Sequence, residues 1–261
     1  MEFLNVLEMD IKINGIDCTE LSPIGKKPEH AIVFYHGFTS SREKAMFRGK
    51  IFASLGYYVL MVEQMGHGTR SDEFKIGDFS ITPDGGLFEI VIKSISESPS
   101  IINYICEKKG FNANNLVIAG HSMGSMVAAG IFVKNPFGSL LCFNGALDYN
   151  GLINRLNRGR LKNDEAALEL KNTLRYYNPA EFLSKLENRP ICIIDGDKDP
   201  VIPTEINKEV IHVLKPFYNN KNLLEYNVIT NASHKMTTES IAIAVNFLES
   251  EDVKNYGKQN K

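Results

Sequence analysis

The chain has 261 residues, of which 43% are hydrophobic, so it can form one large domain with a sizeable core and does not require a second. A formal net charge of −2 argues against a nucleic-acid-binding surface and a polybasic membrane anchor, which makes a small molecule the expected partner. No apolar run reaches the roughly twenty residues of a membrane span, and the N-terminus carries acid where a secretory signal carries base. We therefore expect a soluble, cytoplasmic protein with a single domain over residues 1–261 and no membrane partner.

The cysteines are widely spaced, and three of the four fall inside apolar stretches. This usage predicts reduced core residues rather than a disulfide framework or a metal site. The four are Cys18, Cys106, Cys142 and Cys192.

Apolar strand patterns alternate with helical patterns along the chain. The first is a predicted antiparallel hairpin over residues 3–22, which turns at Asn14-Gly15. Further strands are predicted at 31–35, 57–62, 116–119, 139–144, 190–194 and 223–230. Helices are predicted at 44–55, 84–109, 125–134, 208–214 and 237–249, with Pro99 kinking or splitting the second, residues 72–83 irregular and the charged tail frayed. The alternation predicts an α/β fold in which helices cover both faces of a mostly parallel sheet.

Residues 150–188 are richer in charge and in helix formers than the rest of the chain. Their amphipathic spacing predicts one or two short cap helices over the strand ends, because the insert is too short for a second domain. We interpret its excess of basic residues as a solvated face, with a weak preference for anionic substrates as the alternative. These residues are Arg155, Arg158, Arg160, Lys162, Lys171 and Arg175.

A G-x-S-x-G pattern at residues 120–124 lies between a predicted buried strand and a predicted helix. Glycines two residues before and two residues after Ser122 permit a sharp strand-to-helix turn that exposes the serine at the start of the helix. The amide of Met123 and the helix dipole then face the point where negative charge develops on an attacked carbonyl. The alternative is a purely structural role, in which a glycine- and serine-rich turn packs close to its neighbours.

The strand at 31–35 ends in His36-Gly37-Phe38, where an α/β sheet presents backbone amides to a ligand. We expect the amide of Phe38 to be the second oxyanion donor, while the alternative is an ordinary turn in which His36 only packs. His67 lies in a glycine-punctuated loop and is expected to shape that loop rather than to act as a base.

A serine hydroxyl needs a base to take its proton, and that base needs an anionic partner. His234 is the expected base, because it follows a late strand. Asp199 lies far enough beyond its own strand to turn back towards His234, and we favour it over Asp148, which follows the preceding strand. Asp195 and Asp197 are expected to shape the strand exit and the turn.

These motifs together resemble an α/β-hydrolase, in the chain order serine, acid, histidine: H-G-F at 36–38, G-H-S-M-G at 120–124, G-D-K-D-P-V-I-P at 196–203 and S-H at 233–234. The resemblance covers almost the whole chain, and it is closest to bacterial esterases of the prolyl-oligopeptidase and dienelactone-hydrolase branches. It implies an α/β-hydrolase fold with Ser122 as nucleophile, His234 as base, Asp199 as orienting acid and the amides of Phe38 and Met123 as the oxyanion hole. The chain departs from many relatives in having Glu63-Gln64-Met65 where they read D-x-P, and in having Ser125 where a third glycine is frequent.

The resemblance implies a serine hydrolase that cleaves short- to medium-chain carboxylic esters through an acyl-enzyme, with no metal or organic cofactor. A small-molecule ester is then the expected substrate. The alternatives are a thioesterase or small-amide hydrolase, a non-catalytic ligand-binding protein on the same scaffold, and a cofactor-free lyase or perhydrolase. The sequence does not indicate an oligomeric state.

Overall fold

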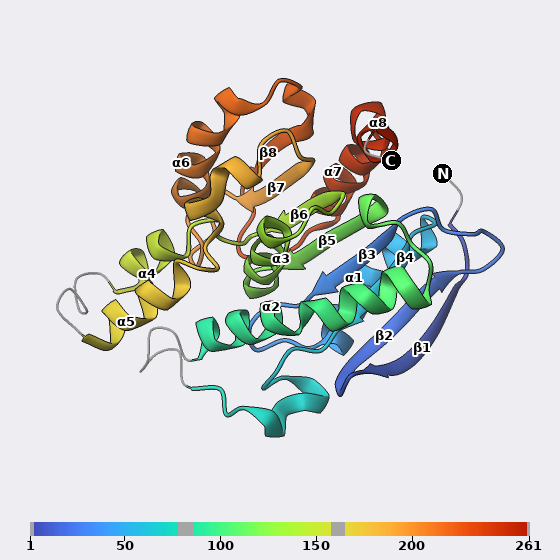
Figure 1. Ribbon diagram of the computed structural model, residues 1–261, viewed down its shortest axis with the longest axis horizontal. Coiled ribbons are helices and arrows are strands. Elements are labelled where there is room, and N and C mark those ends of the chain that lie inside the picture. The colour runs from blue at the N-terminus through green and yellow to red at the C-terminus, as the bar shows by residue number, and fades with distance from the viewer. Residues whose placement is uncertain (1–2, 78–85, 158–164, 260–261) are drawn as a thin grey trace.

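A computed structural model describes residues 3–77, 86–157 and 165–259. The described residues form one eight-stranded sheet in the order β1-β2-β4-β3-β5-β6-β7-β8 (Figure 1). Its strands are β1 (Val6–Ile13), β2 (Ile16–Pro23), β3 (Ala31–Tyr35), β4 (Tyr58–Val62), β5 (Leu116–His121), β6 (Ser139–Phe143), β7 (Ile191–Gly196) and β8 (Leu224–Ile229). The β1–β2 and β2–β4 pairs are antiparallel and the others are parallel, so the predicted α/β-hydrolase fold is confirmed.

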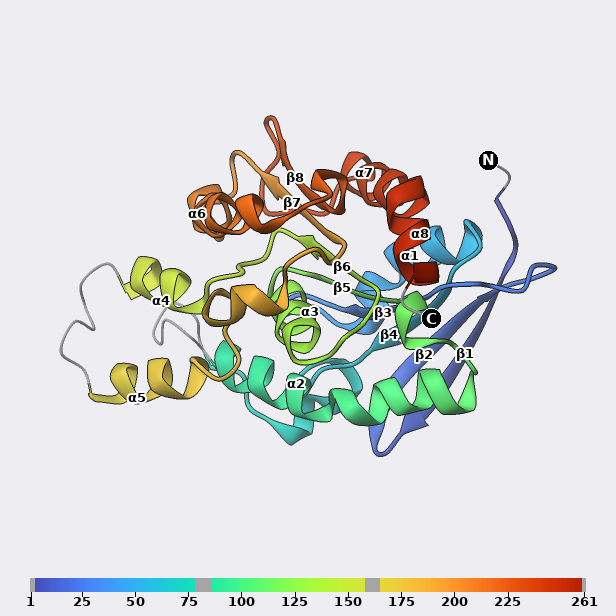
Figure 2. The same ribbon diagram turned by 45° about the horizontal axis from the view of Figure 1, so that its top comes forward.

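Helices cover both faces of this sheet. Figure 2 shows α2 and α3 on one side and α1 and α7 on the other. The α-helices are α1 (Arg42–Ser54), α2 (Leu87–Asn103), α3 (Met123–Lys134), α4 (Tyr149–Asn157), α5 (Glu165–Leu174), α6 (Thr204–Leu214), α7 (Thr238–Glu249) and α8 (Glu251–Gln259). Short 3₁₀ segments are η1 (Gly68–Glu73), η3 (Ala113–Asn115), η4 (Pro179–Lys185), η5 (Lys215–Phe217) and η6 (Lys221–Leu223), and η2 (Tyr104–Lys108) is a π-helical turn.

The predicted hairpin is confirmed at one edge of the sheet. Ile13 pairs with Ile16, and both turn residues have positive φ, 47° at Asn14 and 88° at Gly15. Such a turn twists in the same sense as the strands it joins, which explains why Asn-Gly stands here.

The central strands have no solvated face. Every residue of β3 and β4 is buried, and so is every residue of β5 except His121 at its end. Parallel strands covered by helices on both faces read as continuous apolar runs, which is why the sequence located them well.

The helix over 84–109 differs from its prediction at Pro99, because α2 runs through the proline to Asn103 without a break. Proline has no N–H to give to the carbonyl four residues back, which belongs to Ile95. The hydroxyl of Ser98 donates to that carbonyl at 2.7 Å instead, so the oxygen keeps a partner. Of the two predicted alternatives, a kink or a split, the split at Pro99 is therefore wrong.

The tail beyond residue 249 also differs from its prediction. It forms α8 up to Gln259, with Val253 buried and Asp252 accepting hydrogen bonds from the amides of Asn220 and Asn222. One apolar side chain in a charged stretch is a weak signal, so a frayed end was predicted wrongly.

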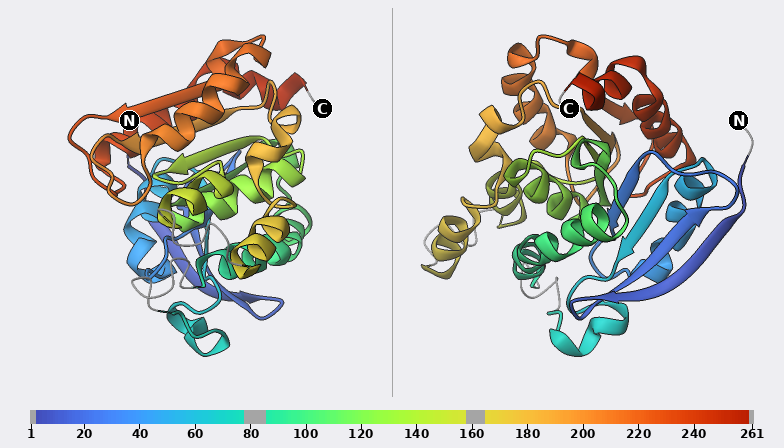
Figure 3. Two further views of the ribbon diagram at one scale, coloured as in Figure 1. Left: turned by 90° about the vertical axis from the view of Figure 1, so that its left-hand side faces the viewer. Right: turned by 45° about the vertical axis from the view of Figure 1, so that its right-hand side comes forward.

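All four cysteines are free, and Cys18, Cys142 and Cys192 are buried, as predicted. Among the described helices, none combines the length and the apolar character that crossing a membrane requires. Between β6 and β7, α4 and α5 project from the body of the molecule (Figure 3). Part of this insert, residues 158–164, lies outside the described residues, as do residues 78–83 of the stretch predicted to be irregular.

Candidate active site

Ser122 stands between β5 and α3 in a backbone conformation that L-residues rarely adopt, with φ 56° and ψ −119°. The two flanking glycines make this turn possible. A Cβ added to Gly120 would come within 2.1 Å of the Gly124 carbonyl oxygen, and one added to Gly124 within 2.0 Å of the Tyr35 carbonyl oxygen. The chain packs too closely for any side chain at either position, which is the steric reason for the pattern.

The structure brings together three side chains that the sequence singled out. The Ser122 hydroxyl lies 2.7 Å from Nε2 of His234, and Nδ1 of His234 lies 2.7 Å from Oδ2 of Asp199. An ionised carboxylate only accepts, so Nδ1 carries the proton and donates to Asp199, while Nε2 accepts the hydroxyl of Ser122. This is the arrangement needed to remove a proton from a serine.

Asp199 is held in its ionised form by its neighbours. Burial by itself would raise the pKa of Asp199, but the hydrogen bond with His234 and those from the amides of Ile202 and Val201 together lower it. The two amides donate to Oδ1 at 2.9 and 2.8 Å, leaving Oδ2 for the histidine. Asp148, the competing acid, accepts instead from the side-chain amide of Asn178.

Asn144 completes the surroundings of the acid and was missed in the sequence. Its side-chain amide donates to Oδ2 of Asp199 at 3.1 Å. Asn144 is the first residue beyond β6 and has a φ of 50°. A polar residue directly after a buried strand, at the edge where the other site residues gather, was the available signal.

The loop after β3 lies directly against the serine. A Cβ added to Gly37 would come within 3.4 Å of the Cβ of Ser122 and within 3.2 Å of Nδ1 of His121. Phe38, expected to supply one oxyanion amide, follows Gly37 in this loop, and Met123, expected to supply the other, follows Ser122 as the first residue of α3.

Two other histidines lie close to the site without joining the hydrogen-bonded series of Ser122, His234 and Asp199. The ring of His121 is 5.3 Å from that of His234, and burial, followed by the charge of His234, lowers the pKa of His121 to about 3. His67 is buried, and its ring hydrogen bonds to the backbone of Thr39 and Met65. Neither contacts Ser122 through a hydrogen bond among the described residues.

Asp195 is buried at the end of β7, where its Oδ2 accepts from the side chain of Asn207 at 2.9 Å. The same asparagine donates to the Gly145 carbonyl and accepts from the Leu147 amide. Asn207 therefore links Asp195, at the end of β7, to the segment that follows Asn144. Burial raises the pKa of Asp195 to about 7, against the hydrogen bond from Asn207.

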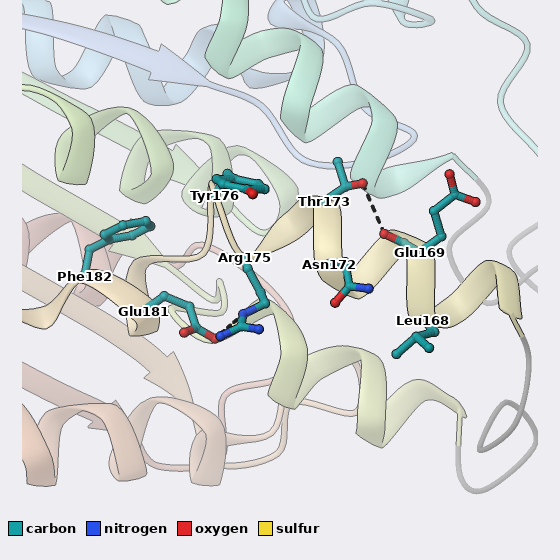
Figure 4. A pocket seen from close by; sticks show the side chains of 8 residues that line it. All are labelled: Leu168, Glu169, Asn172, Thr173, Arg175, Tyr176, Glu181 and Phe182. Atoms are coloured by element: carbon teal, nitrogen blue, oxygen red, sulfur yellow. Dashed lines mark hydrogen bonds and ion pairs between the residues drawn. The ribbon is translucent and has the colours of Figure 1, made fainter.

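Two cavities lie in or beside the insert, and the larger is separate from the triad. It has a volume of about 870 Å³ and is lined along α5 and η4 by residues including Leu168, Tyr176 and Phe182 (Figure 4). A second cavity of about 610 Å³ lies between Arg155 of α4 and the loop that carries Asp199. Within the described ranges, no group of three or more His, Cys, Asp or Glu side chains is arranged to hold a metal ion.

Comparisons with known proteins identify a family, relatives and a similar fold. The model of the prolyl oligopeptidase family matches residues 44–249. Esterase YjfP of Escherichia coli is 27% identical over 86% of this chain and 91% of its own, and the putative esterase YitV of Bacillus subtilis is 24% identical over 84% and 88%. A solved structure from Thermus thermophilus superposes with a TM-score of 0.78 at 20% identity, covering 97% of this chain and 99% of that one.

Proposed function

Because the chain belongs to the prolyl oligopeptidase family, we propose that it is a carboxylesterase-type serine hydrolase that forms its acyl-enzyme on Ser122. The observation that carries this proposal is the continuous hydrogen-bonded series from Ser122 through His234 to Asp199, with both contacts at 2.7 Å. The esterase names of the two curated relatives support the same reaction.

In the acylation step, Nε2 of His234 takes the proton of the Ser122 hydroxyl as the oxygen attacks the ester carbonyl. The imidazolium that forms is stabilised by Asp199, whose Oδ2 already accepts the Nδ1 proton. His234 then gives its new proton to the departing alkoxide, and an alcohol leaves. In deacylation a water molecule replaces the alcohol, and the same proton transfers release the acid.

The negative charge on the carbonyl oxygen is stabilised by the amides of Phe38 and Met123. The Met123 amide stands at the N-terminus of α3, where the helix dipole adds to its effect. Donors fixed in this way before the reaction typically contribute a factor of about 10² to 10³ in kcat each.

We assign residues 150–188 to a small cap that covers the site and limits the length of the acyl chain. In support, the insert is anchored beside the strand ends, because Asn178 accepts from the Tyr149 amide and donates to Asp148. Within the insert Leu152 and Leu174 are buried, while Tyr176 is 72% exposed. A cap of this size favours short- to medium-chain acyl groups over long lipid chains.

The test is covalent labelling combined with turnover. Wild-type protein should react with a fluorophosphonate probe and hydrolyse p-nitrophenyl acetate and butyrate faster than the octanoate. Ser122→Ala should abolish both reactions, whereas Ser125→Ala, three residues further along the chain and inside α3, should still be labelled. A wild-type protein that is neither labelled nor active on any of the three esters would refute the proposal.

The family match favours one second candidate, the hydrolysis of small amides, because the family is named after a peptidase. The acyl-enzyme would be the same and only the leaving group would differ. Turnover of p-nitroanilides of short acids, measured beside the matching p-nitrophenyl esters and thioesters, separates these reactions. An anilide rate equal to or above the ester rate would favour the amidase.

A further inference from the structure

Two buried imidazole rings hold the two peptide planes that meet at Phe38. Nε2 of His67 accepts the amide of Thr39 at 3.0 Å, and Nδ1 of His36 donates to the carbonyl oxygen of Gly37 at 2.9 Å. Both histidines are almost inaccessible to solvent, with 3% and 1% exposure. The loop that supplies the Phe38 amide is therefore fixed by side chains on both sides of that residue.

The contact from His36 acts on the same peptide unit as the oxyanion donor. The Gly37 carbonyl and the Phe38 N–H belong to one planar group and point in opposite directions. Holding the oxygen therefore also sets the direction of the N–H. His36 itself is held by Gln64, whose backbone amide donates to Nε2 at 3.2 Å and whose side chain donates to the His36 carbonyl at 2.6 Å, while Oε1 of Glu63 lies 2.8 Å from the same Nε2.

The contact from His67 acts on the next peptide unit. Thr39 has a φ of 59°, which is unusual for a β-branched residue, so this turn requires support from its surroundings. Only one tautomer of His67 fits, because Nδ1 lies 3.0 Å from the Met65 carbonyl and must carry the proton, which leaves Nε2 free to accept. Burial, followed by the nearby His36, lowers the pKa of His67 to about 4, so the acceptor persists at neutral pH.

We propose that His67, together with the His36–Glu63 pair, is a positioning element that aims the Phe38 N–H at the carbonyl oxygen of the reacting ester. This inference rests on the proposed function, because it assigns a role within the same oxyanion hole. Its physical basis is that an oxyanion donor contributes most when its direction is set before the reaction. Glu63, the first residue beyond β4, thereby supports the loop that follows β3.

The test compares two substitutions at one position. His67→Phe keeps a planar ring but removes the acceptor, whereas the side-chain carbonyl of His67→Gln can still accept from Thr39. We expect His67→Phe to lower kcat on p-nitrophenyl butyrate about 10- to 100-fold, with KM within about two-fold, because it misaligns one oxyanion donor without removing it. His67→Gln should recover most of the loss, and His212→Phe, on the exposed side of α6, should leave kcat unchanged.

A transition-state analogue separates positioning from a general structural role. A trifluoromethyl ketone forms a tetrahedral adduct on the serine, so its affinity should fall in His67→Phe by the same factor as kcat, while the affinity for the product butyrate should not change. A folded His67→Phe protein with kcat within two-fold of wild type would overturn the inference.

A measurement on the unmodified protein remains decisive if the variant does not fold. In ¹⁵N-labelled wild type, His67 should show the Nδ1–H tautomer and stay neutral from about pH 5 upwards; a proton on Nε2 would refute the inference. Failure of the proposed function would appear differently, as wild-type protein that does not react with the fluorophosphonate.

Discussion

Replacing Asp199 by asparagine should leave the fold intact and remove most of the activity. The amides of Val201 and Ile202 both donate to Oδ1, so an asparagine must place its oxygen there and its NH₂ group towards His234. That NH₂ group donates to Nδ1, which forces the proton of the neutral imidazole onto Nε2. Nε2 then no longer accepts the proton of Ser122.

The size of the loss follows from the role of the tautomer. The wrong tautomer of a triad histidine costs about 10⁴-fold in kcat in the well-studied serine proteases. Here the new NH₂ group also faces the side-chain amide of Asn144, which lies 3.1 Å from the present Oδ2, so two donors oppose one another. We therefore expect a loss of about 10³- to 10⁴-fold at pH 7, or about 4 to 5.5 kcal/mol in the barrier.

The assay is hydrolysis of p-nitrophenyl butyrate at pH 7, with circular dichroism to show that the variant is folded. Asp148→Asn is the matched control, because Asp148 is the other acid that follows a strand and its partner is Asn178 rather than His234. Its kcat should remain within about two-fold of wild type. A folded Asp199→Asn protein within ten-fold of wild type, or an Asp148→Asn protein that loses more, would refute the assignment.

Three further substitutions test the surroundings of the site. In the folded protein Asp195 stays protonated up to about pH 7, whereas in the unfolded chain it loses its proton above about pH 4. The free energy of unfolding should therefore fall by up to about 4 kcal/mol as the pH rises between these two values. Asp195→Asn should abolish that fall, and urea unfolding at pH 5 and pH 8 measures it; equal pH dependence in both proteins would contradict the argument. Ser125→Ala should lower the free energy of unfolding by about 1 to 3 kcal/mol, because its hydroxyl accepts the Phe143 amide and donates to a buried carbonyl. Gly124→Ala should cost about 3 kcal/mol or more, seen as loss of folded protein, since the new methyl group would overlap the Tyr35 carbonyl.

The sequence predicted those features that are decided locally. The strands β3, β4 and β5 are buried on both faces and appear as apolar runs, and the steric demand of the serine turn appears as glycines at fixed spacing. The proximity of Ser122, His234 and Asp199 could be inferred because each follows a strand, and the carboxyl ends of parallel strands meet at one edge.

Features that depend on pairing across the sheet could not be predicted in this way. The support of Thr39 by His67 joins residues 28 positions apart, and the amide of Asn144 reaches an acid 55 positions away. The position of His67 or Asn144 in the sequence does not indicate which distant residue its side chain contacts. The role of Ser98 beside Pro99 in α2 likewise becomes clear only from the structure, in which its hydroxyl donates to the Ile95 carbonyl.

The parallel register explains why strained residues accumulate at this edge. Tyr35 pairs with Gly120 and His121 with Phe143, so β3, β5 and β6 end at nearly the same level. The residues just beyond these ends include Thr39, Ser122 and Asn144, all with positive φ. Each such residue costs on the order of 1 to 3 kcal/mol and persists only where its surroundings hold it. Here the surroundings are themselves part of the site, because His67 holds Thr39 and Asn144 holds Asp199, so the same hydrogen bonds that maintain the strained turns also orient the reacting groups.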